Sequence, residues 1–211
     1  MSDGSRFDED YFLRGKELGI SGYTQYRWLP DLTIPMACAM VSHLKVDNDD
    51  TILDFGCARG YLVKALREMG YDAWGYDISQ WALENADEAV KNRFLICNDS
   101  TLYADSFDWV IAKDVLEHVE ELQKTIDEIM NIARKGVFVV VPLSLFDNQP
   151  YIVADYEKDV THIHRLCLSS WAKMFMRPGW SVEGRYMIRG VKQNYQTWEW
   201  GNGFITARRL E

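Results

Sequence analysis

The feature that most constrains the fold is the ten-residue stretch 51–60, Thr-Ile-Leu-Asp-Phe-Gly-Cys-Ala-Arg-Gly. A short apolar run carrying one acid, Asp54, is followed by Gly56 and Gly60. In residues 61–69 apolar side chains then recur at helical spacing. The pattern predicts a strand, a tight turn and a helix. Glycines allow the sharp turn and the close approach of a ligand, and the free N–H groups at a helix start favour an anionic group.

The turn departs from the dinucleotide-binding fingerprint, because Ala58 stands where that fingerprint needs its second glycine. A carboxylate at Asp54 would repel a pyrophosphate but suits an ammonium group. The stretch resembles motif I of class I S-adenosylmethionine-dependent methyltransferases, whose cofactor carries both an ammonium and a carboxylate. The resemblance implies that S-adenosylmethionine, with S-adenosylhomocysteine as product, contacts residues Asp54, Gly56, Cys57, Ala58 and Gly60. A plain strand-to-helix connection is the alternative.

An acid follows the second predicted strand, residues 71–76. Asp77 lies about twenty residues beyond the glycine turn, where α/β nucleotide-binding folds bond ribose hydroxyls, and Ile78 beside it is expected against the adenine. Ser79 is a candidate N-cap for a helix that extends to about residue 91.

Two further strand ends carry polar residues. Asp99 follows the third predicted strand, residues 93–97, and the resemblance implies that it binds the adenine amino group with Ser100 beside it. The fourth predicted strand, residues 107–114, ends in Lys113 and Asp114, which the resemblance places around the methionine part of the cofactor. His118, a little further on, is expected to be a packing residue. The next helix is predicted to end at a Gly136 C-cap.

The end of the chain helps to define the fold class. Residues 136–142 predict a buried fifth strand, and residues 180–188 and 203–209 predict two final strands. The resemblance implies an α/β fold, a doubly wound Rossmann-like seven-stranded sheet with an antiparallel last strand. We expect an N-terminal helical extension over residues 1–46 and a catalytic domain over residues 47–211.

Aromatic residues near glycines mark the N-terminal extension. Tyr23, Tyr26 and Arg27 are expected to close over the methyl donor as a helical lid. The alternative is that these rings only cover the edge of the sheet.

Two histidines, His162 and His164, follow Asp159 in a polar region. An imidazole can act as a general base near neutral pH, and we predict His162 as the base that takes the acceptor proton, with His164 as second candidate. Alternatively, one of them ties the loop to the sheet. No metal is expected, because His162, His164 and Cys167 lack a fourth ligand at a recognised spacing.

The net charge of -9 argues against a nucleic-acid partner, and apolar runs are too short for a membrane span. We therefore predict a cytoplasmic methyltransferase that acts on an oxygen or nitrogen of a small-molecule, for instance sugar-like, acceptor. Two alternatives remain open: a methyltransferase-like cofactor-binding module or partner subunit without turnover, and an NAD(P)-dependent oxidoreductase. The sequence leaves the oligomeric state open.

Overall fold

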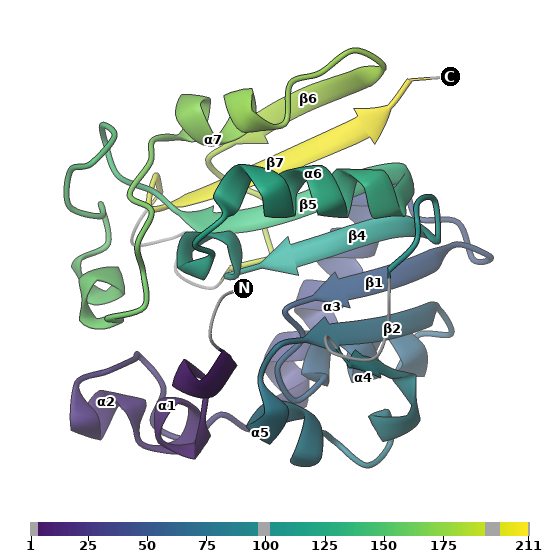
Figure 1. The fold of residues 1–211 in the computed structure, drawn as a ribbon. Coiled ribbons are helices and arrows are strands. Elements are labelled where there is room, and N and C mark those ends of the chain that lie inside the picture. Colours follow the sequence, from purple (N-terminus) through teal and green to yellow (C-terminus); the bar gives the residue numbers. More distant parts are fainter. Residues whose placement is uncertain (1–3, 97–101, 193–198, 211) are drawn as a thin grey trace.

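The computed structural model describes residues 4–96, 102–192 and 199–210. Figure 1 shows one sheet with helices on both faces and short N-terminal helices beside one of its edges. The predicted positions Asp99 and Ser100 lie outside the described residues.

The sheet has seven strands in the order β3-β2-β1-β4-β5-β7-β6. Strands β1 to β5 run parallel, while β7 runs antiparallel between β5 and β6. This confirms the predicted doubly wound sheet and its antiparallel end. The strands are β1 (Thr51–Phe55), β2 (Asp72–Asp77), β3 (Phe94–Ile96), β4 (Phe107–Lys113), β5 (Ala133–Pro142), β6 (Trp180–Arg185) and β7 (Asn202–Arg209).

Helices cover the two faces of the sheet. The α-helices are α1 (Glu9–Leu13), α2 (Gly15–Leu18), α3 (Pro30–Leu44), α4 (Tyr61–Glu68), α5 (Gln80–Glu84), α6 (Leu122–Ile132) and α7 (Leu168–Met174). Short 3₁₀ helices are η1 (Gly4–Arg6), η2 (Lys91–Arg93), η3 (Leu116–His118) and η4 (Ala154–Lys158). Among the helices of the described ranges, none has both the length and the apolar composition that crossing a bilayer requires.

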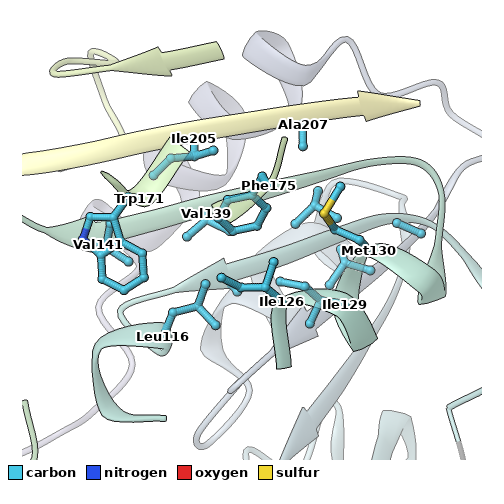
Figure 2. Close-up of a cluster of buried hydrophobic side chains, with 14 of the residues drawn as sticks. Leu116, Ile126, Ile129, Met130, Val139, Val141, Trp171, Phe175, Ile205 and Ala207 are labelled. Carbon is cyan, nitrogen blue, oxygen red and sulfur yellow. The ribbon is translucent and has the colours of Figure 1, made fainter. Parts of the chain in front are cut away.

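Strand β5 shows how the two core layers arise. Its β-branched run places Val137 and Val139 in the layer under α6 and α7, while Phe138 and Val140 face α3 and α4. Side chains of successive strand residues point to opposite faces, so a continuous apolar strand fills both layers. Figure 2 shows the first layer, in which Trp171 and other side chains of α6, α7, β5 and β7 meet.

The predicted C-cap at Gly136 is wrong. Helix α6 ends at Ile132, and Gly136 lies inside β5. A Cβ atom at this position would lie 2.5 Å from the Trp109 ring and 2.8 Å from the carbonyl oxygen of Ala207. The glycine is needed for close packing between strands, which local sequence does not reveal.

The helix predicted from Ser79 to about residue 91 is much shorter. The Ser79 hydroxyl accepts from Ala82 N–H (3.0 Å), which confirms the N-cap, but α5 ends at Glu84. The side-chain amide of Asn85 donates to the Trp81 carbonyl (2.9 Å), and Asp87 forms an ion pair with Lys64 of α4 (3.0 Å). These local and tertiary bonds replace the last helical turns.

Candidate functional site

A cavity of about 890 Å³ lies at the carboxyl ends of β1, β2 and β4. The lid segment, defined here as residues 4–29, contributes Tyr11, Phe12 and several further residues to its lining. In Figure 1 the helices of the lid segment lie on the side to which the arrowheads of β1 and β2 point. Ligands of open parallel sheets bind outside the carboxyl ends of the strands, so this is the expected position of a ligand site.

The glycine turn after β1 forms part of the lining. Gly56 has a φ of +80°, which L-residues with a side chain rarely adopt, and a Cβ atom there would lie 2.4 Å from Val115 Cγ2. The turn therefore depends on glycine for its backbone conformation and for the contact with the segment after β4.

Asp54 places a buried carboxylate on the lining. Asp54 is only 5% exposed, and it is part of the cavity lining. Burial, and to a lesser degree the charge of Asp77, raises the pKa of Asp54 to about 7, although Lys113 acts in the opposite direction. This buried side chain is suited to bind a cationic group, because a nearby positive charge offsets the free-energy cost of ionising the Asp54 carboxyl.

Asp77 joins the two loops that flank the cavity. One of its oxygens accepts from Ala58 N–H (2.7 Å) and the other from Ser79 N–H (2.8 Å). The φ of Ala58 is +47°, so its amide is held in a left-handed turn by this bond. Ile78 lies next to Asp77 on the lining. Burial raises the pKa of Asp77, and the backbone donors oppose the increase.

Past the end of β4, Asp114 binds two ammonium groups. Lys113 Nζ lies 2.5 Å from one oxygen of Asp114, and Lys192 Nζ lies 2.6 and 2.7 Å from its two oxygens. Burial favours the protonated form of Asp114, but the two lysines outweigh it and hold the pKa of this carboxyl below its ordinary value. The cavity therefore has a fixed cluster of charges at this end.

The structure brings most of the predicted cofactor residues together. The lining contains Tyr23, Tyr26, Arg27, Asp54, Gly56, Cys57, Ala58, Asp77, Ile78, Lys113 and Asp114. Gly60 lies apart from it: this residue is the N-cap of α4 with a φ of +77°, and a Cβ atom there would lie 2.4 Å from the Phe94 ring. Gly60 therefore allows the helix to pack, rather than forming the wall of the cavity.

Aromatic contacts hold the lid segment to the rest of the fold. The Phe12 ring stacks on Trp81 of α5, with centroids 5.4 Å apart and an interplanar angle of 16°. Arg59 Nη1 donates to the Tyr26 carbonyl (3.2 Å). On the other side, the Tyr11 hydroxyl donates to Asp159 Oδ2 (2.8 Å). The lid segment thus spans the cavity and is attached at both sides.

A half-buried histidine, for which the sequence predicted only a packing role, lies at the far side of the cavity. His118, expected only to pack, is on the lining, and its Nδ1 lies 2.7 Å from Thr161 Oγ1. Burial, together with His162, lowers the pKa of His118 to about 4. The preceding Glu117 is 1% exposed. Both residues follow shortly after the carboxyl end of the fourth strand, and this placement is the sequence signal that could have identified them as site residues.

The two histidines predicted as bases lie outside the lining that the described residues form. His162 packs its ring 4.6 Å from the His118 ring, and its Nδ1 is 2.8 Å from the Tyr156 carbonyl oxygen. Burial lowers the pKa of His162. The Nε2 of His164 lies 2.6 Å from the Val119 carbonyl oxygen, so this ring ties its loop to the segment after β4.

Comparison with known proteins gives a family match. A model of the methyltransferase domain family matches residues 37–184. No curated protein matches the chain by sequence.

Several solved structures share the fold. One is a chain of the Haloferax volcanii complex between the Trm112 methyltransferase activator and a methyltransferase (18% identity, 94% of both chains, TM-score 0.68). Another is phosphoethanolamine N-methyltransferase 2 of Haemonchus contortus in complex with S-adenosyl-L-methionine (16% identity, 100% of this chain and 60% of that one, TM-score 0.70). A third is an S-adenosylmethionine-dependent methyltransferase from Mesorhizobium loti (16% identity, 81% of this chain and 98% of that one, TM-score 0.60).

Proposed function

The chain belongs to the methyltransferase domain family, within the class I S-adenosylmethionine-dependent superfamily, and we propose that it methylates an oxygen or nitrogen of a small-molecule acceptor. S-adenosylmethionine is its cofactor and S-adenosylhomocysteine the product. The observation that carries the proposal is the pair of buried carboxylates, Asp54 and Asp77, on the lining of one roofed cavity.

The residues of the cavity fit the chemical groups of this cofactor. Asp54 has no hydrogen bond to its carboxylate from the described residues, which suits it to the ammonium group. The first turn of α4 has no side-chain cap, and its Tyr61 and Leu62 line the cavity, so its free N–H groups suit the carboxylate. Asp77 keeps lone pairs for the ribose hydroxyls, and Ile78 offers an apolar surface to the adenine.

The chain's own part in the reaction is mainly to hold two reactants in line. The bound cofactor supplies a methyl group on a positively charged sulfur, which is already activated for transfer. Fixed carboxylates, a glycine turn and an aromatic roof orient the reactants and exclude water, and such positioning can supply roughly 7–11 kcal/mol of the barrier reduction. A small acceptor is supported by the roof of the cavity and by the net charge of -9, which disfavours polyanions.

The acceptor side is proposed to be the end of the cavity near His118. Its position on the lining supports His118 as the imidazole that faces the acceptor, with His162 directly behind it. The assignment of His162 as the base stays a prediction. Proton transfer to His162 would need a path through His118 or through water.

Calorimetric titration tests the cofactor assignment and separates it from the alternatives. We expect S-adenosylhomocysteine to bind with a micromolar Kd and NADH to give no heat of binding. Incubation with methyl-labelled S-adenosylmethionine and a panel of small hydroxyl and amine compounds would then identify the acceptor. Binding of NADH in place of S-adenosylhomocysteine would overturn the proposal. Tight cofactor binding without transfer to any acceptor would favour a binding module or a subunit that needs a partner.

The role of the lid segment gives a second prediction. Replacing Phe12 by alanine removes the stacking on Trp81 and contacts with Tyr23 and Tyr26. Aromatic pairs contribute about 0.5–1.5 kcal/mol each, so we expect S-adenosylhomocysteine affinity to fall about tenfold in calorimetry. The matched control is Leu18→Ala in the same segment, because Leu18 is 45% exposed. Equal affinities of both variants and the wild type would mean that the segment merely covers the edge of the sheet.

A further inference from the structure

Three metal-binding side chains converge beside the cavity. Glu117, His118 and His162 each offer a potential ligand atom, and these atoms all lie within 4.8 Å of one another. Glu117 is 1% exposed, and its Oε2 is buried without a hydrogen-bond partner. A buried carboxylate oxygen without a partner costs free energy unless something else satisfies it.

The hydrogen bonds fix the tautomer of both rings. The Tyr156 carbonyl can only accept, so His162 donates from Nδ1. The Thr161 hydroxyl donates to Asp159 Oδ1 (2.5 Å) and must therefore accept from His118 Nδ1. Both Nε2 atoms consequently carry a lone pair. Asp159 lies 3.8 Å from His162 Nε2, too far for a hydrogen bond.

The backbone holds this arrangement in place. The carbonyl of Glu117 accepts from Ile163 N–H (2.8 Å) and from His164 N–H (3.3 Å), which ties the His162 loop to η3. The three groups therefore come from two segments that are fixed to one another. Metal-binding histidines commonly donate their second ring nitrogen to a carbonyl or carboxylate, as both rings do here directly or through Thr161.

We propose that Glu117, His118 and His162 bind a divalent transition-metal ion. One carboxylate and two imidazoles suit zinc, iron, cobalt or manganese and leave coordination positions open, whereas magnesium and calcium prefer oxygen ligands. Because His118 lines the cavity, an ion held by these three side chains would lie beside the acceptor end. This part rests on the proposed function: an acceptor hydroxyl bound to the ion would release its proton to solvent water more readily, since a bound cation stabilises the oxyanion. The two imidazoles would then act as metal ligands and not as the base.

Titration of the metal-stripped, full-length protein with Co²⁺ and Zn²⁺ tests the proposal. We expect one ion per chain, with a Co²⁺ absorption spectrum typical of nitrogen and oxygen ligands. Affinity should fall at least tenfold in Glu117→Gln and in His162→Gln, which keep the approximate shape of each side chain. His43→Gln is the matched control, because His43 bonds to Thr206 on another face of the sheet and should not affect the affinity.

Titration with S-adenosylhomocysteine shows whether each variant is folded and separates the two proposals. Unchanged metal affinity in both Glu117→Gln and His162→Gln, or no binding by a wild type that binds S-adenosylhomocysteine, would overturn the metal site and leave the proposed function intact. Metal binding by a chain that does not bind S-adenosylhomocysteine would support the site and contradict the function.

Discussion

Replacing Asp77 by alanine is expected to weaken S-adenosylhomocysteine binding at least about 100-fold, a loss of about 2.8 kcal/mol. The Asp77 carboxylate holds the turn at Ala58 and the start of α5 at Ser79, and the proposed ribose contacts use its remaining lone pairs. Hydrogen bonds to a charged group contribute about 1.5–3 kcal/mol each, so losing two of them accounts for the expected effect. Calorimetry on the wild type and the variant measures it.

A matched control lies on the same strand. Asp72 is the first residue of β2, at the opposite end from the cavity, where it pairs with Arg67 and Arg93. Asp72→Ala should keep the wild-type affinity, because exposed ion pairs contribute about 0–1 kcal/mol to stability. None of these three residues is part of the cavity lining. Asp77→Asn, which keeps one acceptor oxygen, should fall between. If Asp77→Ala bound as tightly as the wild type, the cofactor assignment would be wrong.

The sheet and half of the site were predictable because their signals are local. A strand, a glycine turn and a helix follow one another in residues 51–69, and Asp77 is the last residue of the next strand. Parallel strands bring such positions to one edge of the sheet, so sequence spacing translates directly into proximity. The Asp54 and Asp77 pair on the lining follows from this rule alone.

The remaining features depend on contacts between distant segments. The strand position 136 requires a glycine because Trp109 and Ala207 leave no space for a side chain, and neither residue is near Gly136 in sequence. Likewise, His162 joins Glu117 and His118 in one cluster only because residues 159–164 fold back onto η3. The prediction of a histidine site focused on His162 and His164, and sequence spacing could not show that His118 lines the cavity with the His162 ring packed against it.

The pH dependence of cofactor binding is expected to come from Asp54. Its pKa is about 7 in the free protein, chiefly because of burial, whereas the ammonium group of the ligand favours the ionised form. Below that pKa, each pH unit costs about 1.4 kcal/mol, since a proton must leave before the ion pair forms. S-adenosylhomocysteine affinity should therefore rise about 100-fold from pH 5 to pH 8, while the ligand's ammonium and carboxylate keep their charges.

The stability of the free protein should depend on pH in the opposite direction. A carboxyl whose pKa is raised on folding binds its proton more tightly in the native state, so stability falls as pH rises from about 4 to about 7, by on the order of 4 kcal/mol for a shift from 3.8. In Asp54→Asn both pH effects should disappear, and the variant should be more stable than the wild type at pH 8. Urea unfolding and calorimetry across this interval measure the two slopes. A wild-type affinity that stays constant from pH 5 to pH 8 would show that Asp54 does not bind the ammonium group, because a buried acid with this pKa cannot accept that contact without losing its proton.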